Sequence, residues 1–249
     1  MRFDLITIFP GFFAGPLEHG VVPRAAKAGL IEIAVHNLRD YAPGPHHITD
    51  DRPFGGGEGM VMKPEPIVDC LRALLGREPG PQPPGSSIRV CLLSAQGRAF
   101  RQADARAFSR LDRLILICGR YEGVDERIAA HFVDDEIAIG DFVLSGGELA
   151  AAVVLDAAAR LIPGVLGDAQ SALRESFAES DGALDCPHYT RPVEFGPWEV
   201  PLVLRQGNHA AIARWRRQQA LLKTRALRPD LFAQLQLSAE DLALLRDRE

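Results

Sequence analysis

Short apolar runs that each end at a turn signal are the feature that most constrains the fold of this chain. Arg89–Ser94 and Leu114–Cys118 are such runs, and Phe3–Phe9 and Ile31–Val35 also have strand-like composition. Apolar runs of this length are typical of strands buried on both faces of a parallel sheet. The helical candidates that alternate with them are Pro66–Leu75, Gln102–Ser109 and Val124–His131. This alternation predicts an α/β domain.

The second half of the chain indicates one more buried helix, a linker and a small helical domain. Glu148–Leu161 is rich in Ala and Leu, whereas Gly167–Asp185 is polar with little periodicity. Asn208 is a predicted N-cap for a helix over His209–Leu227, and Ser238 begins a capping signal for a last helix. We therefore predict an α/β domain over residues 1–166, a linker over 167–187 and a helical domain over 188–249.

Composition and cysteine placement exclude several classes of protein. No run of about 18 apolar residues occurs, so no membrane span is expected. The first ten residues indicate a β-strand that contains Asp4 rather than a secretory signal. The four cysteines form no CxxC motif, so we expect reduced thiols, no clustered zinc ligands and a cytoplasmic protein. They are Cys70, Cys91, Cys118 and Cys186.

Positive charge is concentrated late in a chain whose net charge is −5. From Arg205 to Arg228 there are seven Arg or Lys residues and no Asp or Glu. Such a stretch can contact nucleic-acid phosphates even on an acidic protein, because salt screens the more distant charges. From charge alone, a solvated helix face explains the pattern equally well. Trp215 lies in the same stretch, and its helical spacing favours a place in the core over a base-stacking role.

Four glycine-containing loops follow or link elements of the predicted α/β domain. They are Asp50–Met60, Leu92–Arg98, Cys118–Arg127 and Ile137–Leu149. Ligands of open α/β sheets bind outside the carboxyl ends of the strands, so the last three loops can together wall one pocket. The first loop has three consecutive glycines but no P-loop Lys-Ser/Thr and no GxGxxG spacing, which favours a flexible loop. On these loops alone, the chain is predicted to be an α/β enzyme that acts on a small ligand.

Six longer motifs cover nearly the whole chain. They are Asp51-Arg-Pro-Phe-Gly-Gly-Gly, Cys118-Gly-Arg-Tyr-Glu-Gly-Val-Asp-Glu-Arg, Ile139-Gly-Asp-Phe-Val-Leu-Ser-Gly-Gly-Glu, Ile162-Pro-Gly-Val-Leu-Gly, Cys186-Pro-His-Tyr-Thr-Arg-Pro and Gly207-Asn-His with Arg214-Trp-Arg. In this order they resemble the motifs of the bacterial TrmD family of tRNA (guanine-N1)-methyltransferases, within the SPOUT superfamily.

The resemblance implies a fold and a cofactor. The family has a parallel α/β sheet domain with a deep trefoil knot, an exception to the rule against threaded loops, followed by a small helical C-terminal domain. Its knot loops hold S-adenosylmethionine. Where the family commonly has Tyr and Pro, this chain has Leu92 and Ala95, so backbone contacts are expected there. The implied cofactor-binding residues are Leu92, Leu93, Ser94, Gln96, Gly119, Arg120, Tyr121, Glu122, Gly123, Ile139, Gly140, Phe142, Leu144, Gly146 and Gly147.

The resemblance also implies a reaction. N1 of guanine carries a proton at neutral pH, and a carboxylate is the natural general base to remove it. By motif, that base is Glu175, where many relatives have Asp, and its nearby rivals are Asp181 and Asp185. Negative charge then builds on O6, and Arg160 matches the cation that stabilises it. Without the resemblance, Glu175 would indicate only a solvated linker carboxylate, and Arg160 a partner of the helix dipole.

The implied substrate is tRNA, methylated at the guanine immediately 3′ of the anticodon (position 37). The implied enzyme is a homodimer, in which each site combines the cofactor pocket of one subunit with the linker and helical domain of the other. Glu122 and Asp141 are motif positions that can help to hold the cofactor or Mg²⁺, and no residue is assigned as a dedicated metal ligand. The implied substrate-binding residues are Ser176, Asp185, His188, Arg191, Arg214 and Arg217.

Three alternatives remain open at this point. The chain could be another SPOUT enzyme that methylates a different base or a ribose of RNA. It could be a tRNA-binding protein that keeps the fold without catalysis, and would then bind tRNA but not S-adenosylmethionine. A small-molecule hydrolase on an ordinary α/β sheet would need a nucleophile–base pair, and the sequence has no GxSxG motif or Cys/His arrangement to supply one.

Overall fold

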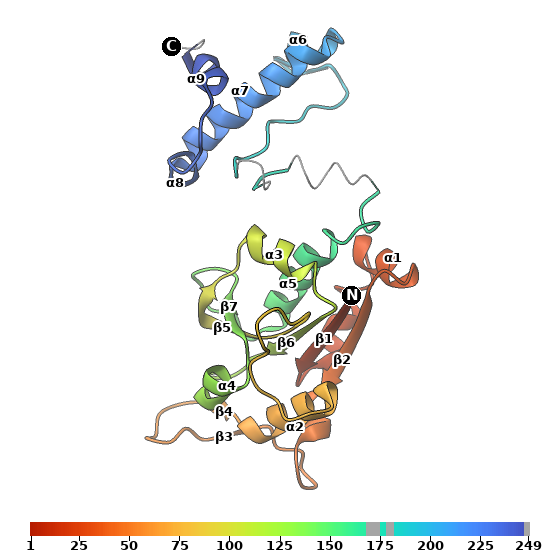
Figure 1. Ribbon diagram of the computed structural model, residues 1–249, viewed down its shortest axis with the longest axis vertical. Helices are drawn as coiled ribbons and strands as arrows, with labels where there is room; N and C mark the ends of the chain where they lie inside the picture. The colour runs from red at the N-terminus through yellow and green to blue at the C-terminus, as the bar shows by residue number, and fades with distance from the viewer. Residues whose placement is uncertain (168–174, 178–181, 247–249) are drawn as a thin grey trace. The chain divides into compact units, whose positions relative to one another are not determined.

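The computed structural model describes residues 1–167, 175–177 and 182–246, and the chain divides into two compact units (Figure 1). The first unit is Met1–Gly167 and the second is Asp168–Glu249. Among the described residues, no helix combines the length and apolar character that a membrane crossing requires.

The first unit alternates strands and helices, as the sequence predicts. Its elements are β1 (Arg2–Thr7), η1 (Pro10–Ala14), α1 (Val21–Lys27), β2 (Glu32–Asn37), η2 (Leu38–Tyr41), β3 (Asp50–Asp51), β4 (Val61–Met62), α2 (Pro64–Leu75), β5 (Ile88–Ala99), α3 (Gln102–Phe108), β6 (Arg113–Cys118), α4 (Glu126–His131), β7 (Asp135–Ala138) and α5 (Glu148–Ala159).

A five-stranded parallel sheet forms the centre of this unit, in the order β2-β1-β6-β5-β7. β1 lies between β2 and β6, with Arg2 opposite Glu32 on one side and Arg113 on the other. The predicted α/β class with a parallel sheet is therefore confirmed. Since all five strands are parallel, their carboxyl ends meet at one edge of the sheet.

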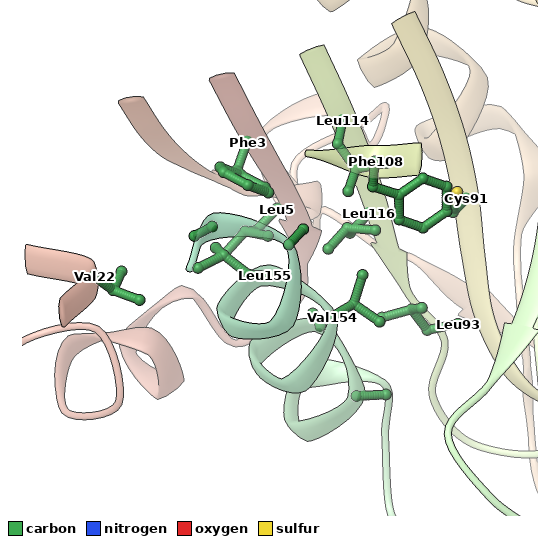
Figure 2. Packing of buried hydrophobic residues seen from close by; sticks show 14 of the residues in the cluster. Phe3, Leu5, Val22, Cys91, Leu93, Phe108, Leu114, Leu116, Val154 and Leu155 are labelled. Carbon is green, nitrogen blue, oxygen red and sulfur yellow. The ribbon is translucent and has the colours of Figure 1, made fainter. Parts of the chain in front are cut away.

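Successive residues of the central strands point into two different apolar cores. In β6, Leu116 belongs to one core and Ile117 to the other. The first core also contains Leu155 of α5 and residues of α1 and α3 (Figure 2), whereas the second contains residues of α2 and α4. Full burial of an aliphatic side chain contributes about 1.5–3 kcal/mol. Burial on both faces is the reason that these strands are continuous apolar runs.

β5 is the element that differs most from the sequence prediction. The strand expected over Arg89–Ser94 continues to Ala99, so the whole of the loop expected over Leu92–Arg98 lies within it. Its pairing with β7 is interrupted, since Leu93 and Arg98 both pair with Ile137. β7 was not predicted, because it has only four residues and two of them are acidic.

The segment between Leu93 and Arg98 passes against the backbone of β7. A Cβ atom on Gly97 would lie 2.3 Å from the Ile137 nitrogen and 2.5 Å from the Glu136 carbonyl carbon. Both neighbours are backbone atoms, which cannot move aside as the end of a flexible side chain can. Only glycine therefore permits this close crossing of the two main chains.

The described part of the second unit is mainly helical. Its elements are β8 (Glu194–Phe195), β9 (Trp198–Glu199), α6 (Leu202–Arg205), α7 (His209–Leu227), α8 (Pro229–Phe232) and α9 (Ala239–Arg246). The predicted N-cap of α7 is confirmed, since the Asn208 side chain accepts a hydrogen bond from the Ala211 amide at 3.1 Å. The predicted capping signal before α9 is also confirmed, since the Asp241 amide donates to the Ser238 hydroxyl at 3.1 Å.

A fully buried carboxylate, that of Asp4, connects three strands of the sheet. It accepts hydrogen bonds from Arg113 of β6 at 2.6 Å and Arg2 of β1 at 3.1 Å, and lies 2.7 Å from Nε2 of His36 in β2. Burial by itself would raise the pKa of Asp4, but the bonds with His36, Arg113 and Arg2 overcome it and hold the pKa well below its ordinary value.

We predict that Asp4→Asn lowers the free energy of unfolding by about 2–4 kcal/mol at neutral pH, because it leaves partly buried cations without their counter-charge. The depressed pKa means that the ionised carboxylate stabilises the folded protein above the unfolded-state pKa of about 3.9, and that this contribution is lost as the pH falls below it. Urea unfolding at several pH values should therefore show a smaller acid-induced loss for Asp4→Asn than for the parent. Asp112→Asn, at an exposed carboxylate, is the control and should behave as the parent.

Candidate functional site

A cavity of 220 Å³ opens in the first unit at the carboxyl ends of β6 and β7, beside residues 92–96 of β5. All fifteen residues implied as cofactor-binding by the sequence line this one cavity. They come from three segments, 92–96, 119–123 and 139–147, that are far apart in the sequence. Because parallel strands end at the same edge, the sheet brings these segments together. Asp141 is not among the lining residues.

Further residues that sequence reasoning did not select also line the cavity. Val143 and Ser145 lie in the third segment, and their position inside the motif that begins at Ile139 could have identified them. Glu126 of α4 and Glu136 of β7 also line the cavity, and no pattern in the sequence distinguishes them from ordinary surface acids.

The segment after β6 is held by the earlier glycine-rich loop. The Glu122 amide donates to the Met60 carbonyl at 3.0 Å, and the Met62 amide donates to the Gly123 carbonyl at 2.9 Å. A Cβ atom on Gly59 would lie 2.6 Å from Cγ of Glu122, and Gly59 has a φ of +80°. The end of the Asp50–Met60 loop is thus a support for the cavity wall, which the interpretation as a flexible loop did not include.

The half-buried Arg120 and the buried Glu148 form an ion pair that links two walls of the cavity. Glu148 begins α5 and is 1 % exposed, and its Oε2 lies 3.0 Å from a guanidinium nitrogen of Arg120. The Thr7 hydroxyl of β1 donates to the other carboxylate oxygen at 2.7 Å. Arg120 also donates to the Ser145 carbonyl at 3.1 Å, and its guanidinium lies 4.6 Å from the centre of the Phe9 ring.

This pair positions the cavity loops through charge-assisted hydrogen bonds. Arg120 comes from the segment after β6, whereas Ser145 lies in the segment before α5. Since the guanidinium bonds both the buried Glu148 carboxylate and the Ser145 carbonyl, it holds the two loops relative to each other. A Cβ atom on Gly146 would lie 2.2 Å from Nε of Arg120, so the glycine leaves the space that the guanidinium occupies.

The predicted catalytic and substrate-binding residues lie in both units. Arg160, the C-cap of α5, is half-buried in the first unit. Glu175 is half-buried in the second, next to Ser176, whose hydroxyl accepts from the Asp185 amide at 3.0 Å. The structure therefore brings Ser176 and Asp185 together. Asp181, a rival for the base, lies outside the described residues.

Asp185 also holds His188, with Nε2 at 2.8 Å from Oδ2. Burial would raise the pKa of Asp185, but hydrogen bonds from His188 and from the Cys186 amide outweigh burial and lower it. The carboxylate form of Asp185 is thereby favoured, and the imidazole of His188 stays largely exposed.

The three predicted arginine contacts differ in their surroundings. Arg191 and Arg214 are exposed. Arg217 is half-buried and donates two hydrogen bonds to Asp241, at 2.7 and 3.0 Å. These bonds join α7 to α9. They are also the main reason that the pKa of Asp241 falls to about 2. Trp215 is half-buried beside Tyr189, with 6.3 Å between the ring centres.

Comparison with known proteins gives a consistent result over nearly the whole chain. The profile of the family described as tRNA (Guanine-1)-methyltransferase TrmD matches residues 1–234. A tRNA (guanine-N(1)-)-methyltransferase of Koribacter versatilis is 54% identical, with 99% of this chain and 98% of the relative covered. Proteins of the same name from Geobacter sulfurreducens and a strain of Dehalococcoides mccartyi are 52% and 49% identical, with at least 95% of each chain covered.

We predict that Gly147→Ala destabilises the protein by about 1–3 kcal/mol, because it overpacks a backbone crossing. The new Cβ would lie 2.8 Å from Cα of Cys118 and 3.0 Å from the Gly119 nitrogen. Gly15→Ala is the matched control, since its φ is −78° and its Cβ would meet no atom within 4 Å. Urea unfolding of both variants measures the difference, and equal stabilities would contradict the crowding argument.

Proposed function

The chain belongs to the TrmD family and is a tRNA (guanine-N1)-methyltransferase, and from this premise we propose which of its residues carry the reaction. We propose that the cavity of the first unit binds the methyl donor, S-adenosylmethionine, and that Glu175 and Arg160 act on the guanine at position 37. The observation that supports this most directly is that all fifteen implied cofactor residues line one cavity.

The chemistry of the cavity fits a nucleoside that carries an amino acid. Glycines 119, 140, 146 and 147 bring backbone N–H and C=O groups to the cavity wall, where they can bind the polar parts of the ligand. Leu93 and Leu144 offer apolar surface for an adenine ring. S-adenosylmethionine supplies a methyl group on a positively charged sulfur, which is ready for displacement. The Arg120–Glu148 pair keeps the two loops in place while the ligand binds.

The remaining task is to make N1 of guanine a nucleophile. In the proposed step the Glu175 carboxylate takes the N1 proton, and the freed electron pair forms the new N–C bond as the methyl–sulfur bond breaks. Negative charge that develops on O6 is stabilised by the guanidinium of Arg160. Ser176 follows the proposed base in the chain and accepts a hydrogen bond from the Asp185 amide, so these two residues would orient the base or the nucleotide.

A homodimer would supply both halves of this site. Exposed apolar side chains lie at the cavity and along α5: Phe142 is 54 % exposed, Val143 87 % and Val153 46 %. Large exposed apolar surfaces are characteristic of association sites, which supports a second copy as the partner of this face. In the proposed arrangement the second unit of one copy supplies Glu175 and the tRNA contacts His188, Arg191, Arg214 and Arg217, with cofactor bound in the other copy.

The proposal includes a trefoil knot in the first unit and the boundaries of two domains. The trefoil knot is supported by the crossing at Gly97, where β5 pairs with β7 on both sides of a bend. The proposed domains are residues 1–166 and 188–249, joined by a linker.

In the proposed site, Glu122 would hold Mg²⁺, since carboxylate oxygen is the donor that this ion prefers. We also propose a cytoplasmic location, which the tRNA substrate supports.

The reaction and its position are tested together by mass spectrometry of nucleosides. Purified protein, S-adenosylmethionine and Mg²⁺ are incubated with a tRNA transcript that has guanines at positions 36 and 37. We expect N1-methylguanosine, and we expect none when guanine 37 is changed to adenine. A second incubation without Mg²⁺ tests the ion. Product from the adenine-37 transcript would contradict the proposed position, and absence of product with confirmed cofactor binding would contradict the proposed substrate.

The role of Glu175 is tested by Glu175→Gln, which keeps the shape and removes the basic carboxylate. We expect kcat to fall by about 10²- to 10⁴-fold, the usual contribution of a general base, with little change in the binding of either substrate. Glu194→Gln is the matched control at an exposed carboxylate of β8 and should keep the parent kcat. A Glu175→Gln enzyme that turns over near the parent rate would exclude this residue as the base.

A further inference from the structure

Three donor atoms of different chemical kinds lie together at the beginning of the described part of the second unit. One carboxylate oxygen of Asp185, the sulfur of Cys186 and one ring nitrogen of His188 all lie within 4.8 Å of one another. We propose that these residues form a binding site for a soft divalent cation of the Zn²⁺ class. The sequence contains no CxxC motif, but these three ligands of different kinds stand close together in the chain and meet in space.

The backbone around the three ligands is held before any ion binds. The Leu184 amide donates to the hydroxyl of Thr224, a fully buried residue of α7, at 3.0 Å. The Asp185 amide donates to Ser176, and the Cys186 amide donates to Asp185 Oδ1 at 2.7 Å. Cys186 itself is 5 % exposed. Two of the three ligands are therefore fixed by hydrogen bonds or burial, and an ion would not have to order a flexible loop.

The donor set distinguishes between metals. Zn²⁺ binds thiolate sulfur at about 2.3 Å and imidazole nitrogen or carboxylate oxygen at about 2.0–2.2 Å, in a tetrahedron. Ligand atoms of such a site are roughly 3–4 Å apart, so the present separations need only a small contraction. Mg²⁺ prefers six oxygen donors and is not suited to sulfur and nitrogen. The site is thus expected to select Zn²⁺ or a similar ion over Mg²⁺.

Binding exchanges protons for the ion. The hydrogen bond that joins His188 Nε2 and Asp185 Oδ2, at 2.8 Å, is replaced by two bonds to the metal. The proton of Nε2 leaves to solvent and the exposed Nδ1 takes one up, so that the neutral imidazole offers the lone pair of Nε2 to the ion. The Cys186 thiol binds as thiolate and releases its proton to solvent. Three protein ligands leave a fourth position for water.

This site has a consequence that rests on the proposed function. Asp185 and His188 are two of the proposed tRNA contacts, and the oxygen and nitrogen atoms that bind the metal are no longer available to tRNA. A bound ion should therefore compete with tRNA, which would make the enzyme sensitive to soft divalent cations at the same residues that it uses for its substrate.

The metal site is tested with Co²⁺, which replaces Zn²⁺ in tetrahedral sites and gives a thiolate-to-cobalt charge-transfer absorption. The full chain, first treated with chelator, is titrated with Co²⁺. We expect the absorption to saturate at one equivalent, to disappear when Zn²⁺ is added and to persist in excess Mg²⁺. Cys186→Ala should abolish it, whereas Cys70→Ala, at a fully buried thiol of the first unit, should leave it unchanged.

His188→Ala provides a second variant that does not depend on a buried position, since the His188 side chain is 71% exposed. Loss of a ligand should weaken Co²⁺ binding at least as much as the roughly 10- to 100-fold that loss of an outer-shell partner costs. Three outcomes would overturn the site: no charge-transfer absorption in the parent, its persistence in Cys186→Ala, or an unchanged affinity in His188→Ala.

Addition of unmodified tRNA to the cobalt-loaded protein separates the site from its consequence. Release of Co²⁺, seen as loss of the absorption, would support competition at Asp185 and His188. An absorption that persists at saturating tRNA would overturn the competition and count against these two residues as tRNA contacts, while the methylation assay independently decides the proposed reaction.

Discussion

The close crossing of the β5 and β7 main chains is the constraint on which the rest of the first unit depends. At Gly97 the backbones approach so closely that a Cβ atom would lie within 2.3 Å of a peptide nitrogen. This contact allows β5 to pair with Ile137 on both sides of a bend, which turns the end of one strand into a cavity wall. A fold built on such a contact tolerates only glycine at that point.

The cavity depends on a second constraint, the pair of the half-buried Arg120 and the buried Glu148. A buried carboxylate is costly unless it is paired and fully hydrogen-bonded. Here Thr7 and Arg120 provide those bonds, the Ser145 carbonyl accepts from Arg120, and the Phe9 ring covers the guanidinium. The same bonds join β1, the segment after β6 and the beginning of α5. Loops that are already held in place lose less conformational entropy when a ligand binds. The ion pair that holds these loops therefore also favours the binding of a ligand in the cavity.

The second unit uses polar groups differently. Arg217 and Asp241 connect α7 with α9, and Thr224 anchors the backbone before Asp185. These contacts hold the chain that carries the proposed substrate residues. One consequence is that a residue predicted from a basic stretch, Arg217, already has an internal partner, whereas Arg191 and Arg214 stay exposed. Net charge in a sequence stretch identifies the surface that can meet phosphate, but it does not distinguish exposed arginines from those that stabilise packing.

The sequence by itself determined the α/β class, the parallel sheet, most of the helices and the family, because apolar periodicity, capping residues and motifs are local properties. It also identified fifteen of the residues that line the cavity, since they stand in three segments of characteristic sequence. It did not reveal β7, the extension of β5 or the support that Gly59 gives to Glu122. Those features arise from contacts between segments far apart in the chain. Only the tertiary structure decided them, because pairing partners and backbone clearances exist only after the sheet has assembled.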